Sequence, residues 1–371
     1  MVGTTIVVHR GLHRYCSHPC IAQLAGGEWI VAFCESTRTE ADFLHPPSDP
    51  RFVNLLCRSR DQGQRWEAPR VVPGYDWYGV ETPGIARISN GDVLLNQWRF
   101  LWYPVEEARK RWRAGDELYV CGPVSDPHAH GWRPARSEDD WEEHPFPYAR
   151  ADGGAWVHIS TDGGSTWDVT VPIDAAPYRG AFSPRGAIEL AGGDLLLALG
   201  SQDHDPLAAT LIVRSTDRGR SWGPPVEVAR APGLLFSEPS VVETESGSLL
   251  VFSREEVTGH LHLSESRDGG RTWGEPRPLP FPGYPTHAIR LRDGRLFIIY
   301  GCRAEPFGIR AAVSEDDGRT WGRQLVVRED LPSVNLGYPS VIEYAPRKLF
   351  AVYYGEDDDG VTFIQGTYLA V

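Results

Sequence analysis

The sequence is poor in methionine and cysteine, and it has a deficit of positive charge. One methionine and six cysteines occur among its 371 residues. Six cysteines are too few for a disulfide framework, and a chain of this length can bury a core that needs none, so we expect reduced thiols. Lys and Arg number 37 against 50 Asp and Glu, for a formal net charge of −13. This balance argues against nucleic acid as a partner, and an acidic ligand would need a local basic site.

Long apolar runs are also missing. None approaches the roughly 20 residues of a membrane-spanning helix, and the first ten residues have neither the basic start nor the apolar stretch of a secretory signal. We therefore expect a cytoplasmic protein with no membrane partner. No nucleotide, flavin or haem motif is present, and Cys16-Ser-His18-Pro-Cys20 lacks the C-x2-C spacing and second ligand pair of a zinc site. No metal and no cofactor are predicted.

A motif that occurs five times indicates the fold. The pattern S-x-D-x-G-x-[TS]-W, the Asp box, occupies residues 59–66, 160–167, 215–222, 266–273 and 314–321, with Arg65 as the one departure. In a tight hairpin, Asp accepts backbone N–H groups and Gly adopts positive φ at little cost. The Trp then packs the turn against its neighbour. We therefore interpret the box aspartates as scaffold and nominate none of them as catalytic.

A second repeat lies between the boxes. A polar residue, usually followed by Pro, precedes alternating apolar positions and a turn at residues 18–27, 82–91, 183–192, 238–247, 286–294 and 338–345. Apolar alternation with a period of two, closed by a Gly-containing turn, indicates the inner hairpin of a propeller blade. Six hairpins with five boxes predict an all-β, six-bladed β-propeller whose last blade lacks a box.

The two ends of the chain are expected to close the ring. A strand at residues 4–9 precedes the first hairpin and has no hairpin of its own. It can pair with residues 361–369 in the last blade, which removes the exposed sheet edges. We therefore expect a single domain that spans residues 1–371.

Blade two carries an insertion at about residues 99–155. Successive box aspartates are 101, 55, 51 and 48 residues apart, so the extra length lies between the first two boxes. The insertion is rich in Trp, Tyr and His, which is too aromatic for a disordered linker. We interpret it as a packed loop over one face, which borders the functional site or else covers a blade edge or a subunit contact.

One face of such a ring gathers the starts of the first strands and the ends of the second strands. Ionisable and aromatic residues are frequent at these positions, which suits a site for a polar, anionic sugar. The candidates include His18, Arg38, Glu81, Arg185, Gln202, Glu238, Arg254, Glu255, His287, Arg303 and Tyr338.

The boxes, the segment 236–254 and the segment Leu336-Gly-Tyr338-Pro-Ser-Val resemble the non-viral sialidase (neuraminidase) superfamily. The resemblance covers essentially the whole chain outside the insertion and implies an exo-acting glycoside hydrolase for a terminal, anionic sugar. It implies that Tyr338 is the nucleophile, Glu238 its partner, and Arg254 one of three arginines that bind the substrate carboxylate. A phenol with a pKa of about 10 needs such a carboxylate to take its proton. Sialidases are an exception to the use of two carboxylates in glycoside hydrolysis.

The other two carboxylate-binding arginines of the family are matched less directly. The family begins its first hairpin with Arg-Ile-Pro, whereas this chain has Ser17-His18-Pro19. His18 therefore stands at the position of one arginine, where it can supply a hydrogen bond or a proton. Arg303 and Arg310, both in blade five, are the candidates for the third arginine.

The resemblance also implies residues near the first hairpin. Arg38, at the end of that hairpin, resembles a substrate-contacting arginine of the family. The acid/base aspartate belongs in the following loop, where Asp42 and Asp49 both occur, and we favour Asp42.

Two other functions are compatible with the same fold. Some related propellers are lyases that act on uronate sugars, and His18 and His287 make proton transfer beside a carboxylate conceivable. A carbohydrate-binding propeller without catalytic activity is the second alternative, because fold does not imply function. The pairing of Tyr338 with Glu238 distinguishes an enzyme from a binding module, which has no evident need for it.

Overall fold

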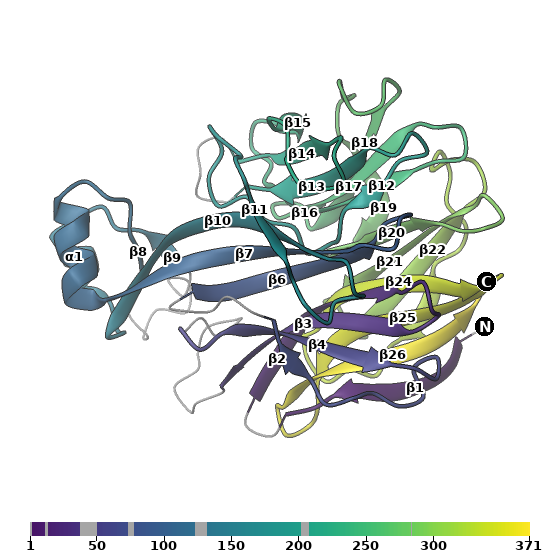
Figure 1. Cartoon of the computed structure of the whole chain (residues 1–371), viewed down its shortest axis with the longest axis horizontal. Coiled ribbons are helices and arrows are strands. Elements are labelled where there is room, and N and C mark those ends of the chain that lie inside the picture. The colour runs from purple at the N-terminus through teal and green to yellow at the C-terminus, as the bar shows by residue number, and fades with distance from the viewer. Residues whose placement is uncertain are drawn as a thin grey trace.

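The computed structural model describes residues 2–11, 14–37, 50–72, 78–122, 132–201, 208–282 and 284–371. Six antiparallel sheets form the blades of a ring, and the two helices lie outside it (Figure 1). Inner strands of neighbouring blades contact one another: that of blade one contacts those of blades two and six, and that of blade five contacts those of blades four and six. The predicted all-β, six-bladed β-propeller is confirmed.

Blade one contains β2 (Arg14–Gln23), β3 (Trp29–Thr37), β4 (Val53–Ser59) and β5 (Arg70–Val71). Blade two contains β6 (Tyr78–Arg87), β7 (Val93–Pro104), β10 (Tyr148–Ser160) and β11 (Val169–Ile173), with β8 (Tyr119–Cys121) and β9 (Trp132–Pro134) beside β10. Blade three contains β12 (Ile188–Glu189), β13 (Leu195–Gly200), β14 (Thr210–Ser215) and β15 (Val226–Ala229).

Blade four contains β16 (Phe236–Glu243), β17 (Leu249–Glu255), β18 (His260–Ser266) and β19 (Arg277–Pro282). Blade five contains β20 (His287–Arg290), β21 (Leu296–Cys302), β22 (Gly308–Ser314) and β23 (Leu325–Arg328). Blade six contains β24 (Gly337–Ala345), β25 (Lys348–Glu356), β26 (Thr362–Ala370) and β1 (Val2–His9), so its outermost strand comes from the start of the chain.

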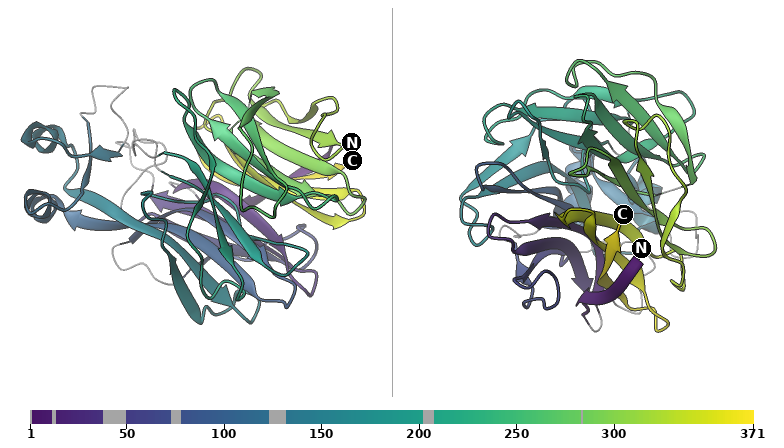
Figure 2. Two further views of the ribbon diagram at one scale, coloured as in Figure 1. Left: turned by 90° about the horizontal axis from the view of Figure 1, so that it is seen from above. Right: turned by 90° about the vertical axis from the view of Figure 1, so that its right-hand side faces the viewer.

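This pairing of β1 with β26 closes the ring as predicted. The two strands are antiparallel, with Thr5 opposite Thr367 and Val7 opposite Gln365. The hydroxyl groups of Thr5 and Thr367 are 2.8 Å apart. The N- and C-terminal ends therefore lie close together in one blade (Figure 2).

The Asp boxes make the hydrogen bonds that their sequence predicts. In the box at residues 266–273, the Asp268 carboxylate accepts the Thr272 backbone N–H at 2.9 Å and the Thr272 hydroxyl at 2.6 Å. Ser266 donates to Asp268 at 2.8 Å and accepts the Gly270 N–H at 2.8 Å. In the first box, the departure Arg65 keeps the backbone bond to Asp61 at 2.8 Å. The box aspartates are thus fully used by their own turns.

The innermost strands of four blades share an unusual backbone conformation that positions the site. His18, Thr82, Glu238 and Tyr338 have φ values of 54°, 47°, 46° and 48°, and each precedes a proline. Each lies at a break in the register with the second strand of its blade. The left-handed region is costly for residues other than Gly, and such strain collects at functional sites. These bulges turn the four side chains out of the regular alternation of their strands.

The insertion of blade two forms an arm that projects from the ring (Figures 1 and 2). Strands β7 and β10 are paired along its length and carry α1 (Val105–Arg113), β8, β9 and α2 (Glu138–Glu143). Ser137 and Asp140 form a capping box at the start of α2. Trp141, Leu118 and Val120 are buried in a small core of the arm. The arm is therefore a folded unit. None of the helices that the structure describes is long and apolar enough to cross a bilayer.

Candidate active site

Tyr338 and Glu238, which are 100 residues apart in the sequence, meet at the centre of the ring. The Tyr338 hydroxyl donates a hydrogen bond to Oε1 of Glu238, which joins β24 of blade six to β16 of blade four. Only 6% of Tyr338 and 5% of Glu238 is exposed. A phenol in this position can pass its proton directly to the carboxylate.

Arg254 binds the second oxygen of Glu238. Its Nη1 lies 2.8 Å from Glu238 Oε2, and its Nη2 lies 2.6 Å from Glu256 Oε2. The sequence pointed to Glu255, but this carboxylate accepts backbone N–H groups of its own turn, including that of Val257 at 2.7 Å. Arg254 is the penultimate residue of β17, and Glu256 is the first residue of the turn that follows this strand. No pattern in the sequence distinguishes Glu256 from Glu255, so sequence reasoning missed it.

Arg303, rather than Arg310, joins this group. Arg303 donates to the Leu336 carbonyl oxygen from Nε at 3.1 Å and from Nη2 at 3.0 Å. Arg254 and Arg303 both pack on the Tyr284 ring, with Cζ atoms 4.7 and 4.6 Å from its centre. Arg310 donates to backbone carbonyl groups within blade five, away from Tyr338. A role for Arg303 in binding a substrate carboxylate stays a prediction.

His18 lies against the ring of Tyr338. The two ring centres are 4.0 Å apart with an interplanar angle of 75°, and His18 Nδ1 is 2.7 Å from the Ser17 hydroxyl. The Tyr354 hydroxyl accepts from Arg303 Nη2 at 3.3 Å on the same side of the group. Blades one, four, five and six thus each contribute to the surroundings of Tyr338.

Burial and the neighbouring Glu238 charge keep the phenol of Tyr338 protonated in the free protein. Burial raises the pKa of Tyr338 well above its usual value, and the negative charge of Glu238 raises it further. The nearby Arg254 and Arg303 guanidinium groups lower it in part. A carboxylate in contact with a phenol can activate it by taking its proton, and Glu238 is placed to do so.

Arg185 and His287, two predicted substrate-binding residues, are engaged with the backbone. Arg185 is 3% exposed and donates to the carbonyl oxygens of Thr286 at 2.9 Å and Pro285 at 3.2 Å, which links blades three and five. His287 Nδ1 accepts the Val341 N–H at 2.9 Å. Desolvation, together with the charge of Arg185, lowers the pKa of His287 to about 3, so it is neutral. Both side chains support the inner strands, and a role in substrate binding stays a prediction.

Glu81 lies in blade two, next to the bulge at Thr82. Burial raises the pKa of Glu81 to about 7, the Arg150 guanidinium opposes this shift, and the charge of Glu238 adds to it. Glu81 is 9% exposed. It is therefore a buried carboxyl that exchanges its proton near neutral pH.

The Glu81→Gln variant is expected to change how stability depends on pH. The folded protein keeps the Glu81 proton up to about pH 7, whereas an ordinary carboxyl loses it near 4.5. Folding stability therefore falls as pH rises from about 4.5 to about 7, by up to about 3 kcal/mol, and the penalty is complete above that range. Glu81→Gln removes this penalty, so it should stabilise the protein at about pH 8 and change little at about pH 5.

Urea unfolding of both proteins across this pH range measures the effect. Glu329→Gln, at an exposed carboxyl, is the matched control and should follow the wild-type curve. Identical pH dependence of the wild-type and Glu81→Gln proteins would contradict the expected burial of the Glu81 charge.

Three predicted site residues, Arg38, Asp42 and Gln202, lie outside the described residues. Asp49, the alternative acid/base, does so as well. The described part of the site consequently includes the nucleophile candidate, its carboxylate partner and two arginines, and the roles of all the predicted site residues stay predictions.

With this geometry established, comparison with known proteins is informative. Residues 160–347 match the family described as a BNR repeat-like domain, and this match spans half of the chain. The chain belongs to this family. The prediction of a sialidase-like, Asp-box propeller is thereby confirmed at the level of the family.

Two sialidases are similar to parts of this BNR-repeat protein. The sialidase of Micromonospora viridifaciens is 30% identical over 189 residues, which are 44% of this chain and 28% of that protein. The sialidase of Bacteroides fragilis (strain YCH46) is 22% identical over 225 residues, 59% of this chain and 37% of that protein. A crystal structure of a protein of unknown function from Dyadobacter fermentans DSM 18053 has a TM-score of 0.81 at 23% identity, over 99% of this chain and 98% of that one. The matches to the two sialidases, from Micromonospora viridifaciens and Bacteroides fragilis, thus cover only about a third of the length of each.

A cavity of about 340 Å³ opens beside the central group of this BNR-repeat protein. Glu238, Arg254 and Glu256 line one side of it, and residues from blades two and three line the other. The lining residues from these two blades include Trp98, Trp132, Arg150, Phe182 and Ser201. Trp132 and Arg150 belong to the insertion, so the arm borders the site. The sequence indicated no role for Arg150, because nothing in its neighbourhood distinguishes it from the other arginines of the arm.

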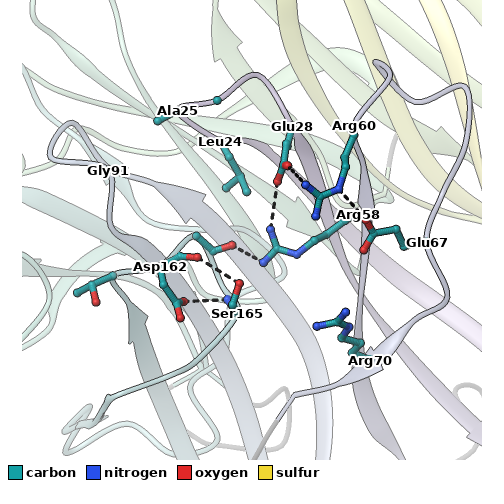
Figure 3. Close-up of a pocket in the computed structure, with 13 residues that line it drawn as sticks. Leu24, Ala25, Glu28, Arg58, Arg60, Glu67, Arg70, Gly91, Asp162 and Ser165 are labelled. Atoms are coloured by element: carbon teal, nitrogen blue, oxygen red, sulfur yellow. Dashed lines mark hydrogen bonds and ion pairs between the residues drawn. The ribbon is translucent and has the colours of Figure 1, made fainter.

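A larger cavity, of about 470 Å³, lies between blades one and two (Figure 3). It is formed by the β2–β3 turn and by an Asp box, at the opposite end of the blades from His18 and Tyr338. Arg58 donates to the Gly163 carbonyl, and Arg60 lies 2.7 Å from Glu28 and 2.8 Å from Glu67. The bond from Arg58 to Gly163 connects the two blades, whereas the ion pairs of Arg60 lie within blade one. We assign no ligand to this cavity.

Within the described ranges, one group of side chains has the spacing of a metal site. The ligand atoms of His9, Cys16 and Glu35 lie within 4.8 Å of one another. His9 Nε2 is 2.9 Å from Glu35 Oε2, and the Cys16 thiol donates to the same oxygen. Burial and the charge of Glu35 raise the pKa of Cys16 well above its usual value, which opposes the thiolate that a metal needs. We interpret the group as a hydrogen-bonded cluster.

Proposed function

We propose that this protein is a sialidase-like, exo-acting glycoside hydrolase that acts on a terminal anionic sugar. The observation that carries the proposal is the buried hydrogen bond between the Tyr338 hydroxyl and Glu238. Both residues have strained backbone, at φ values of 48° and 46°. A module that only binds sugar has no need to hold a tyrosine against a carboxylate at this cost.

In the proposed reaction, Tyr338 Oη attacks the anomeric carbon while its proton passes to Glu238. The bond to the leaving oxygen breaks, and that oxygen receives a proton from Asp42 or from His18. A water molecule then attacks the anomeric carbon of the glycosyl-tyrosine, returns a proton to the Asp42 or His18 that protonated the leaving oxygen, and releases the sugar. Tyr338 recovers its proton from Glu238, so the enzyme returns to its initial state.

The cations around Tyr338 favour an anionic substrate. Arg254 and Arg303 both pack on Tyr284. The positive charge of each arginine lowers the pKa of Tyr338, so both arginines act electrostatically on the reacting phenol. A neutral phenol approaches an anionic sugar without the repulsion that a carboxylate nucleophile would meet. Arg38 is proposed to contact the substrate beside them, as the family resemblance implies.

A panel of aryl glycosides that contains sialosides, uronides and rhamnosides tests the proposal. We expect release of the phenol from at least one anionic glycoside by the purified protein. Polyuronates are assayed in parallel for the ultraviolet absorbance of a new carbon–carbon double bond. Formation of that double bond without phenol release would instead establish a lyase. Binding of sugars without either reaction would establish a carbohydrate-binding propeller.

A further inference from the structure

The cavity beside Glu238 has aromatic walls. Trp98 of β7 and Phe182, which precedes blade three, stack with ring centres 4.7 Å apart and an interplanar angle of 13°. Trp132 of the arm lies on the same cavity. Aromatic faces bind the apolar faces of ring-shaped ligands, and a few polar groups among them fix orientation. These walls suit a sugar ring.

Arg150 is a buried cation at this cavity. It is 7% exposed, and its Cζ lies 3.9 Å from the centre of the Phe100 ring and 4.8 Å from that of Trp132. Its Nη1 is buried and has no hydrogen-bond partner among the residues that the structure describes. A buried N–H of a charged group normally has an acceptor, because its loss of hydration is costly. Arg150 therefore has unused capacity to bind an anionic oxygen.

The other charged groups that line the cavity are already paired. Arg254 contacts Glu238 at 2.8 Å and Glu256 at 2.6 Å. Its two nearby carboxylates would repel an anion that approached Arg254 from this side. An anionic group that enters the cavity is consequently drawn to Arg150, in blade two, and away from Arg254.

We propose that this cavity is a subsite for an anionic sugar, in which Trp98, Trp132 and Phe182 hold the ring and Arg150 binds a carboxylate or sulfate substituent. The inference rests on the proposed function, because it names the class of substrate for the same site. It assigns to the arm a role in specificity, since Trp132 and Arg150 both come from the insertion. The subsite adds a cation distinct from Arg254 and Arg303, because Arg254 is already paired with Glu238 and Glu256.

Binding to the catalytically impaired Tyr338→Phe protein tests the subsite without turnover. Isothermal titration is carried out with methyl glucuronide, glucose 6-sulfate and methyl glucoside. We expect the better of the two anionic sugars to bind about 10-fold or more tightly than the neutral glucoside, as a charge-assisted hydrogen bond predicts. The comparison of the uronide with the sulfated sugar identifies the substituent. Equal affinity for all three sugars would overturn the proposal.

Arg150→Met in the same background removes the charge and keeps most of the side-chain length. It should abolish the preference for the anionic sugar and change glucoside binding by no more than about 2-fold. Arg111→Met is the matched control on the arm, because Arg111 makes exposed ion pairs with Glu107 and Asp116 and should leave the preference intact. Trp132→Ala should weaken charged and neutral sugars alike. An Arg150→Met protein that retains the preference would overturn the proposal.

Inorganic sulfate gives a test that needs no folded Arg150 variant. It should compete with the anionic sugar and leave the glucoside unaffected, and failure to compete would count against the subsite. The two proposals also fail separately. Arg150-dependent binding without hydrolysis of any glycoside would refute the hydrolase and support the subsite, whereas hydrolysis of an anionic glycoside without Arg150-dependent binding would do the reverse.

Discussion

The Tyr338→Phe protein is expected to lose catalytic activity and to remain folded. On the best aryl glycoside, kcat/KM should fall on the order of 10³-fold or more, because the variant has no atom that can form the bond to the sugar. The Phe ring keeps the packing against His18, whose centre is 4.0 Å away. Glu238 loses one partner but keeps its 2.8 Å contact with Arg254. Steady-state kinetics and thermal unfolding, measured together, separate the two effects.

Tyr300→Phe is the matched control for this experiment. Tyr300 is also fully buried, and its hydroxyl accepts from Gln324 at 2.7 Å in blade five. Removal of that hydroxyl has a structural cost of the same kind, but it should leave kcat/KM unchanged. Equal activity of the wild-type and Tyr338→Phe proteins would exclude Tyr338 as the nucleophile.

Glu238→Gln should produce the second largest effect. The amide cannot take the proton of Tyr338, so we expect kcat/KM to fall by about 10²–10⁴-fold, the range for loss of a general base. The negative charge of Glu238 raises the pKa of Tyr338, whereas Arg254 and Arg303 lower it. In Glu238→Gln the phenol should therefore ionise at lower pH than in the wild-type protein.

The ultraviolet absorbance of tyrosinate measures that ionisation. Subtraction of the Glu238→Gln, Tyr338→Phe double variant isolates the signal of Tyr338 from the other tyrosines. A purely structural role for Glu238 would lower activity through unfolding and would leave no such shift in the folded protein. If the phenol of Glu238→Gln ionises no earlier than that of the wild type, the assumed coupling between the two residues is wrong.

The strained bulges explain how the propeller supports such a pair. In a regular strand the residue before a proline adopts extended backbone, and its side chain follows the alternation of the strand. At His18, Thr82, Glu238 and Tyr338 the φ values of 46° to 54° break this rule. Close contact between neighbouring inner strands helps to fix this geometry, because a Cβ atom at Gly84 would collide with the Arg185 carbonyl group. The ring thus stabilises conformations that an isolated blade would not hold.

The propeller fold could be predicted from local patterns in the sequence. Five Asp boxes and six inner hairpins follow from local chemistry, since each turn is closed by residues within eight positions of one another. Ring closure by residues 4–9 could also be predicted. The first strand has no partner in blade one and the last blade lacks one strand, so pairing the two removes both exposed edges. Tyr338 and Glu238 were identified through motifs that surround them in the sequence.

Local patterns could not predict which of the remaining candidate residues lie together. Arg303 and Arg310 are seven positions apart in the sequence, yet only Arg303 packs on Tyr284 beside Arg254. Sequence reasoning missed Arg150 of β10 because its aromatic surroundings come from two other strands of the arm, β7 and β9. Local patterns specify turns and strands through contacts within a few residues. The charge environment of a site depends on side chains brought together from distant blades, which only the closed ring defines.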